Sequence, residues 1–176
     1  MLLRFKKSRF LILFRILVPY ILIAAAMILI FSKILLLSVV PSGSMEPTIS
    51  SGNLILGTRI NSRDIQRYDI MIFRPTDDTG GYYIKRVIGL PGETITVSDG
   101  NVYADGILLD SSYLKEPMDT SGDGIYIVPD GCYFMLGDNR NVSSDSRFWD
   151  DPYVPIENFV GHARLIIFPL HKVALL

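Results

Sequence analysis

The pattern of hydrophobic and polar residues divides the chain into one continuous apolar stretch near the N-terminus and a body of short alternating segments. Residues 16–32 carry no charge, and the apolar residues 11–14 extend this run beyond Arg15. About 20 apolar residues cross the hydrocarbon core of a bilayer, and a long arginine side chain can reach the interface. Residues 11–33 are therefore predicted to form one transmembrane helix that anchors the chain.

The charges around this apolar run predict its orientation. Four basic residues lie at positions 4–9, whereas the first acidic residue of the chain is Glu46. Because positive residues favour the cytoplasmic side of a membrane, residues 1–10 are predicted to be a cytoplasmic basic stub, and residues 34–176 an extracytoplasmic domain. A cleaved signal peptide is the alternative interpretation. The length of the apolar run disfavours it, and so does the lack of a convincing small-x-small cleavage site after the run.

Beyond residue 33, the apolar residues come in short runs separated by turn signals, a pattern typical of β strands. No stretch after residue 40 has the 3.6-residue period of a long helix. The runs predicted to be strands are 34–40, 53–59, 68–73, 82–90, 93–97, 101–103, 106–109, 132–136 and 159–168. The polar, glycine-rich residues 110–131 are predicted to be an excursion over the surface. The expected fold is mainly β, a coiled antiparallel, barrel-like sheet preceded by one N-terminal transmembrane helix.

Composition narrows the functions open to this domain. From residue 34 onward, 11 lysines and arginines stand against 18 aspartates and glutamates. Nucleic-acid binding requires a basic surface, so no nucleic-acid partner is expected. Cys132 is the only cysteine, and His162 and His171 are the only histidines. Neither a disulfide within the chain nor a cysteine- or histidine-rich metal site is therefore expected, and we predict no metal and no cofactor.

The segment Pro-Ser-Gly-Ser-Met-Glu-Pro-Thr at 41–48 follows the apolar run directly. Proline fixes φ and glycine permits a tight turn, so this loop can hold the Ser44 hydroxyl still and expose backbone N–H groups beside it. A nucleophile and an oxyanion hole require both properties. An ordinary surface turn has the same composition, so the segment alone leaves both interpretations open.

A serine nucleophile needs a base, and Lys85 is the strongest candidate. In an extended strand it shares a face with Tyr83 and Val87, whereas Arg86 faces the other way. A lysine on an apolar face loses its proton more easily, because burial disfavours the charged form. A lysine that reaches solvent at a strand edge is the alternative. The two histidines are more typical of structural or exposed positions.

Residues 137–147 form a third unusual segment, with one apolar residue in eleven. Asp145 and Arg147 lie two positions apart, so in an extended backbone they face the same side and can pair. A solvated polar loop would have a similar composition. The position of the segment between a strand and the aromatic pair Phe148-Trp149 instead favours a packed functional loop.

These segments and the apolar run resemble the bacterial type I signal peptidases, which are membrane-anchored serine proteases with a Ser/Lys dyad. Four motifs carry the resemblance in order along the chain: Pro-Ser-Gly-Ser-Met-x-Pro-Thr at 41–48, Tyr-Asp-Ile-x-x-Phe at 68–73, Lys-Arg-Val-x-Gly-x-Pro-Gly at 85–92, and Gly-Asp-Asn-Arg…Ser-x-Asp-Ser-Arg at 137–147. One motif would be a weak signal, but four in this order behind an apolar segment are specific. Lysine at position 85 argues against the eukaryotic and archaeal branch, in which histidine is the base.

The resemblance implies roles for residues at the reacting centre. Ser44 matches the nucleophile, and Lys85 matches the general base. Ser42 matches the hydroxyl that joins the Ser44 backbone N–H in the oxyanion hole. Ser143 matches the serine that helps to orient the lysine.

The resemblance also implies roles for residues around that centre. Asp145 and Arg147 match a pair that supports the site structurally without taking part in the chemistry. Met45 and Ile84 fall where the family lines its substrate cleft.

The activity implied by the resemblance is removal of N-terminal signal peptides from exported preproteins, by cleavage after a small-x-small motif. The implied partners are these signal peptides, the lipid bilayer and a secretion translocase. The implied location is the plasma membrane of a bacterium, with a single membrane pass, the N-terminus in the cytoplasm and the catalytic domain on the extracytoplasmic face.

Two alternatives to this activity remain open from the sequence. Pilus or conjugation maturation proteases and the self-cleaving repressors of DNA-damage responses use the same dyad, although the apolar anchor and the acidic domain disfavour the repressors. A catalytically silent, membrane-anchored β domain that binds a partner is the non-enzymatic alternative. Such a scaffold has no need of Ser44 or Lys85.

Overall fold

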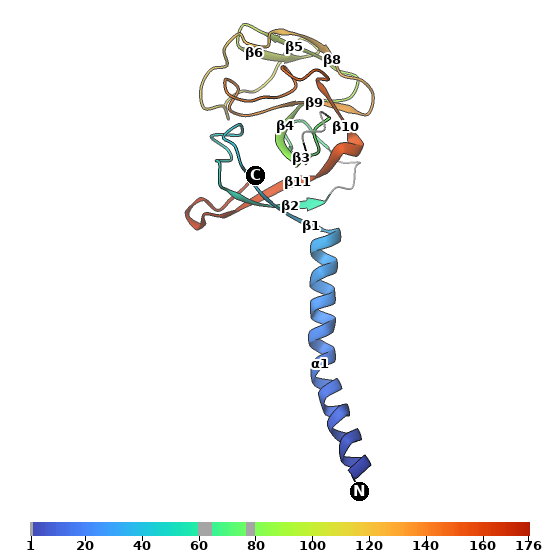
Figure 1. The fold of residues 1–176 in the computed structure, drawn as a ribbon. Coiled ribbons are helices and arrows are strands. Elements are labelled where there is room, and N and C mark those ends of the chain that lie inside the picture. The colour runs from blue at the N-terminus through green and yellow to red at the C-terminus, as the bar shows by residue number, and fades with distance from the viewer. Residues whose placement is uncertain (1, 60–64, 77–79) are drawn as a thin grey trace. The chain divides into compact units, whose positions relative to one another are not determined.

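The structure of the protein, a computed structural model, describes residues 2–59, 65–76 and 80–176. The chain divides into two compact units, Met1–Leu36 and Leu37–Leu176, and each is described by itself. The first unit holds one long helix, and the second holds almost all of the β structure (Figure 1).

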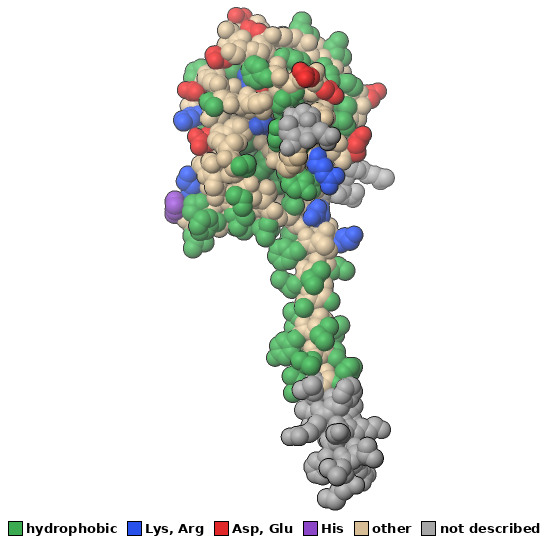
Figure 2. Space-filling model, in the orientation of Figure 1, with side chains coloured by type: hydrophobic (Ala, Val, Ile, Leu, Met, Phe, Trp, Pro, Cys, Tyr) green, Lys and Arg blue, Asp and Glu red, His purple; other side chains and the backbone are tan. Residues whose placement is uncertain are grey.

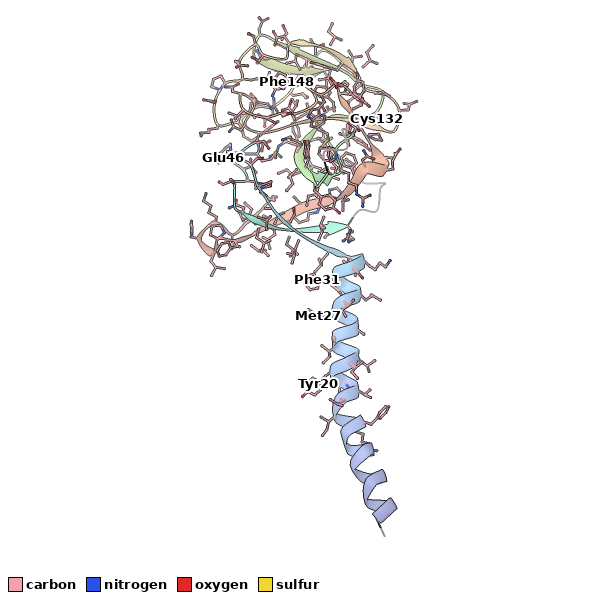
Figure 3. The ribbon with its side chains drawn as sticks, in the orientation of Figure 1. Tyr20, Met27, Phe31, Glu46, Cys132 and Phe148 are labelled. Atoms are coloured by element: carbon pink, nitrogen blue, oxygen red, sulfur yellow. The ribbon has the colours of Figure 1, made fainter. Side chains whose placement is uncertain are left out.

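The helix α1 (Leu2–Lys33) contains the predicted apolar run, with Pro19 inside it. In the part of the chain that the structure describes, it is the one helix whose stretch Phe14–Lys33 is long and apolar enough to cross a membrane. Most side chains of Phe14–Lys33 are exposed, and the labelled Tyr20, 67% exposed, projects outward from the helix (Figure 3). Hydrophobic side chains cover this stretch on the visible face (Figure 2). In water such a surface would be unfavourable, whereas lipid would solvate it.

The second unit is built on a large antiparallel sheet with the strand order β1-β2-β11-β3-β4-β9-β10, and β12 also pairs with β11. Its strands are β1 (Leu35–Val39), which starts at the boundary of the two units, β2 (Leu54–Arg59), β3 (Ile70–Phe73), β4 (Tyr83–Gly89), β9 (Cys132–Leu136), β10 (Tyr153–Pro155), β11 (Phe159–Phe168) and β12 (Ala174–Leu175). Two short 3-10 helices, η1 (Ile156–Asn158) and η2 (Leu170–Lys172), flank β11.

A smaller sheet has the order β7-β6-β5-β8, with strands β5 (Thr94–Ser98), β6 (Asn101–Ala104), β7 (Ile107–Leu108) and β8 (Gly124–Ile127). Two-residue turns connect β5 to β6 and β6 to β7. Each turn is an Asp-Gly pair, at residues 99–100 and 105–106, with positive φ at both residues. Type I′ hairpin turns require this backbone, and Asp-Gly sequences favour it.

The apolar run 132–136 is buried on both faces because two cores enclose β9. Phe134 and Leu136 pack in one cluster with side chains of the small sheet, such as Ile95. Tyr133 and Met135 pack on the other face in a second cluster. A strand covered on both sides needs apolar residues at successive positions, which explains why this segment does not alternate.

The predicted fold class is confirmed: the described strands pair antiparallel, and an apolar helix precedes them. The large sheet does not close into a barrel among the described strands, since its order has ends at β1 and β10. The strands predicted at 132–136 and 159–168 have the predicted bounds. The prediction of an excursion over 110–131 was incomplete, because β8 lies within it and pairs with β5.

Candidate active site

Ser44 lies in a tight turn between β1 and β2 that apolar side chains hold in place. The backbone N–H of Glu46 donates to the carbonyl of Gly43 at 3.1 Å, and that of Ile49 donates to the carbonyl of Met45 at 2.8 Å. The Met45 and Ile49 side chains are fully buried. The buried side chains of Met45 and Ile49 therefore fix the position of Ser44 at the edge of the core.

Lys85 lies in the middle of β4, between β3 and β9. Its side chain is 5% exposed and its Nζ donates to Ser44 Oγ at 2.7 Å. The pKa of Lys85 is lowered to about 8, chiefly by burial, which disfavours the charged amine. Arg147 lowers this pKa as well, whereas Asp145 and Asp138 raise it. In mildly alkaline solution a large fraction of the amine is therefore neutral and can act as a base.

A pocket of about 410 Å³ opens beside these two residues. The Ser42 Oγ donates to Ser44 Oγ at 3.3 Å, which brings both hydroxyls to the same wall. The pocket is lined by Val39, Val40, Pro41, Ser42, Gly43, Ser44, Tyr82, Tyr83, Ile84, Lys85, Asn139, Val142 and Ser144. Most of this lining is apolar, so an extended apolar segment could lie against it with Ser44 at its side.

Residues 137–147 hold the Ser44 loop from the other side. The backbone N–H of Asn139 donates to the Ser44 carbonyl at 3.0 Å, and its side-chain amide donates to the Gly43 carbonyl at 3.1 Å. A Cβ at Gly137 would lie 2.5 Å from the Ser44 carbonyl oxygen, so only glycine permits this approach. The packed loop expected from the sequence is present.

Asp145 and Arg147 form the predicted pair inside this segment. Arg147 Nε donates to Asp145 Oδ1 at 2.8 Å, and both side chains are fully buried. Asp145 Oδ2 also accepts the backbone N–H of Gly137 at 3.0 Å. The second guanidinium nitrogen reaches the Arg140 carbonyl at 2.6 Å, so the pair fixes the path of the whole segment.

The sequence of this chain matches a protein family over most of its length. The model of the family described as signal peptidase, peptidase S26, matches residues 13–168. The chain belongs to the signal peptidase family. It is 41% identical over 144 residues to a probable signal peptidase I-2 of Synechocystis sp., covering 78% of this chain and 65% of that protein. It is 36% identical over 174 residues to a signal peptidase I of Pseudomonas fluorescens, covering 70% and 61%.

A solved structure of a signal peptidase I from Enterococcus faecalis is also similar, with 34% sequence identity and a TM-score of 0.49. The match covers 57% of this chain and 97% of that one. The chain thus spans roughly two thirds of the length of the curated signal peptidases just described.

The sequence did not predict one ion pair that connects the signal peptidase motifs. Arg86, which faces away from Lys85, donates from Nε and Nη2 to the Asp138 carboxylate at 2.8 and 2.6 Å. The Thr48 hydroxyl donates to the same carboxylate at 2.5 Å. This contact ties the end of the Ser44 loop to β4 and to residues 137–147. The only signal in the sequence was three polar residues inside three separate motifs.

Ser143, which the resemblance matches to a serine that helps to orient the lysine, makes no hydrogen bond to Lys85 in this structure. The Ser143 side chain is buried, and its Oγ has no hydrogen-bond partner among the residues that the structure describes. Of the two residues expected in the substrate cleft, Ile84 lines the pocket. Met45 is 1% exposed and packs beneath the loop instead.

The remaining candidates for chemistry lie in other surroundings. His162 is buried on β11, with Nδ1 3.5 Å from a carboxylate oxygen of Asp69. His171 lies on the exposed η2. Burial raises the pKa of the Cys132 thiol, which disfavours the reactive thiolate. Within the described ranges, no group of three or more His, Cys, Asp or Glu residues is placed to hold a metal ion.

Proposed function

We propose that the chain is a membrane-anchored serine endopeptidase that removes N-terminal signal peptides from exported preproteins. The observation that carries this proposal is the 2.7 Å contact between the buried Lys85 amine and Ser44 Oγ. An unperturbed lysine has a pKa of ~10.4, whereas burial lowers the pKa of Lys85 to about 8, so a substantial share of this amine is neutral in mildly alkaline solution. Membership of the signal peptidase family supports the same activity.

In the proposed mechanism, neutral Lys85 accepts the hydroxyl proton as Ser44 Oγ attacks the carbonyl carbon of the scissile peptide bond. The oxyanion of the tetrahedral intermediate is stabilised by the Ser44 backbone N–H and the Ser42 hydroxyl. Protonated Lys85 then gives its proton to the leaving amine, and an acyl-enzyme on Ser44 remains. Water attacks this ester with Lys85 again as the base, which releases the signal peptide and restores both side chains.

The substrate is proposed to lie in the pocket as an extended segment with small side chains near the cleaved bond. Ile84 of β4 and Ser42 of the Ser44 loop both line the pocket. The proposed cleavage after a small-x-small motif requires subsites that are too shallow for larger side chains. Backbone hydrogen bonds to a strand edge would hold such a segment without demanding a fixed sequence.

Three residues behind the dyad are proposed to support it. The unpartnered Ser143 Oγ would accept a hydrogen bond from Lys85 once the amine carries the extra proton, and would so orient it. Asp145 and Arg147 would keep residues 137–147 against the Ser44 loop and set the charge around the amine. None of these three residues is proposed to touch the scissile bond.

The incubation of the detergent-solubilised full chain with an exported preprotein tests the activity. We expect a shorter product whose new N-terminus, read by sequencing, follows a small-x-small motif. The Ser44→Ala variant is the matched control and should give no product. A product formed equally by this variant, or no product from the unchanged chain, would reject the proposal.

The Ser42→Ala change tests the oxyanion hole. We expect the variant to fold normally, because Ser42 is an exposed loop residue that contributes no core packing. Loss of one such donor costs on the order of 10²–10³ in kcat, with a much smaller change in KM, because the bond strengthens in the transition state. Steady-state kinetics measure both constants. An unchanged kcat would show that Ser42 does not face the developing charge.

The proposed topology places residues 1–10 in the cytoplasm, residues 11–33 across the bilayer and residues 34–176 outside, with the bilayer and a secretion translocase as partners. Protease added to intact spheroplasts should then digest the β domain and spare the N-terminal stub. Immunoblots with a tag at each end measure this. Complete protection of the C-terminal tag would reverse the orientation.

A further inference from the structure

The smaller sheet carries an apolar surface that the proposed peptidase activity does not use. This sheet lies at the end of the second unit far from β2 (Figure 1). Its inner side chains, such as Ile95 and Val97, belong to the core. On the outer face, however, Ile125 is 71% exposed, Ile127 68% and Leu108 58%. These exposed fractions are large for aliphatic side chains in a regular sheet. Polar side chains could occupy the same outward-facing positions.

The exposed residues form one surface because the strand register aligns them. Leu108 lies opposite Tyr103, Tyr103 opposite Thr96, and Thr96 opposite Ile125. Ile127 lies two residues further along β8 on the same face. Side chains directly opposite on adjacent strands are in contact distance. We call these five residues, Leu108, Tyr103, Thr96, Ile125 and Ile127, the outer stripe.

Acidic residues lie at both ends of the smaller sheet, and the segment that contains them carries the whole acidic excess of the domain. We call Asp99, Asp105 and Asp123, which lie at these two ends, the acidic rim. Residues 91–131 contain eight aspartates and glutamates and one lysine, whereas the rest of 34–176 contains ten acidic and ten basic residues. At one end of the sheet the Asp99 backbone N–H donates to Asp123 Oδ2 at 3.2 Å. At the other end, Asp105 Oδ1 accepts the Thr94 N–H at 2.9 Å. Figure 2 shows acidic and hydrophobic side chains interspersed at this end of the unit.

We propose that the outer stripe is a docking surface for another polypeptide whose contact face combines apolar side chains with lysines or arginines. An apolar centre inside a charged rim is typical of protein interfaces. Because the charge of this rim is negative, it favours a partner with positive side chains. A second copy of this chain would bring the same acidic rim against its own. Anionic lipid headgroups would be repelled in the same way. Residues of the outer stripe do not line the pocket beside Ser44, so docking and catalysis are separable.

A synthetic peptide that alternates lysine and valine serves as the probe, and its counterpart alternates glutamate and valine. The full chain is held in phosphatidylcholine nanodiscs, and peptide binding is followed by biolayer interferometry with empty nanodiscs subtracted. We expect saturable binding of the lysine peptide that weakens as salt is raised, because salt screens the acidic rim. The glutamate peptide should not bind.

The double variant Ile125→Thr, Ile127→Thr tests the apolar part. Threonine keeps the β propensity and the charge of the sheet, and both positions are exposed, so the fold should be retained. We expect binding at least about tenfold weaker, because two aliphatic side chains lose their contact area. Leu175→Thr is the matched control, since Leu175 is 86% exposed on β12, and it should bind as the unchanged chain does.

The triple variant Asp99→Asn, Asp105→Asn, Asp123→Asn tests the rim without changing its shape. Asparagine keeps the acceptor oxygens and tolerates the positive φ of Asp99 and Asp105. We expect weaker binding and a smaller salt dependence, with cleavage of a preprotein unchanged. Equal binding of the glutamate peptide, or undiminished binding by the isoleucine double variant, would overturn the proposal. Self-association of the unchanged chain that disappears in the isoleucine variant would assign the stripe to a second copy instead.

Discussion

Replacement of Lys85 by arginine is expected to abolish peptide-bond cleavage although charge and length are similar. A guanidinium stays protonated throughout the accessible pH range and cannot accept the Ser44 proton. We expect kcat/KM to fall on the order of 10⁴–10⁶-fold, as for loss of a dyad or triad member elsewhere. Cys132→Ala and His162→Ala are the controls and should keep cleavage activity. Substantial turnover by Lys85→Arg would remove the lysine from the mechanism.

The pH dependence of kcat/KM should reflect the same amine. The base must be neutral, and its pKa is about 8, so the rate should rise with pH and level off above that value. An exposed lysine would place this rise near pH ~10.4. A pH titration of kcat/KM with a peptide substrate locates the midpoint. A rise that is centred near the unperturbed value would show that Lys85 is not buried in the working enzyme.

Lys85 should also lower the stability of the fold. Its pKa falls from 10.5 in the unfolded chain to about 8 in the folded one, so the unfolded chain binds more protons between these values. The free energy of unfolding therefore rises as pH increases from about 8 to 10.5 and carries the full penalty below 8. Lys85→Met should be inactive yet more stable at pH 7, by on the order of 3 kcal/mol. The folded structure therefore holds the catalytic amine in surroundings that destabilise its charged form.

Local patterns predicted most of the fold, and they failed where a strand depends on distant partners. β9 and β11 are apolar runs with clear turn signals at their ends, and their bounds were predicted. β8 is four residues long, begins with glycine and exposes both of its isoleucines. Its pairing with β5, about thirty residues earlier in the chain, makes it a strand, and no periodicity inside the segment reveals this.

The candidate site divides in the same way. Strand alternation placed Lys85 opposite to Arg86, and the two side chains make separate contacts. Asp145 pairs with Arg147 as predicted, but within a turn closed by the Phe148 N–H and the Asp145 carbonyl rather than in an extended backbone. The contact of Arg86 with Asp138 spans 52 positions, and sequence spacing carries no information on it. Family resemblance alone assigned Ser143 a role in orienting Lys85, and the structure shows no hydrogen bond between the two side chains. These contacts depend on how the Ser44 loop, β4 and residues 137–147 pack together.

The other large effect is expected at Asp145, through stability rather than chemistry. Asp145→Asn keeps an acceptor for the Gly137 N–H but leaves the Arg147 guanidinium buried without a counter-charge. Breaking a buried ion pair on one side costs about 3–5 kcal/mol, so the thermal unfolding temperature should fall clearly. Lys115→Met is the control, because it breaks the exposed pair with Glu46 at 3.8 Å, which contributes at most about 1 kcal/mol.

The pH profile separates structural support from a direct role of Asp145. Its charge raises the pKa of Lys85, so Asp145→Asn should move the rise of kcat/KM to lower pH while the maximal rate falls. Arg147 lowers the same pKa, so Arg147→Met should move that rise to higher pH. The double variant should recover part of the lost stability, because no unpaired buried charge remains. If Asp145→Asn removed activity with unfolding temperature and pH midpoint unchanged, Asp145 would have to act on the substrate itself.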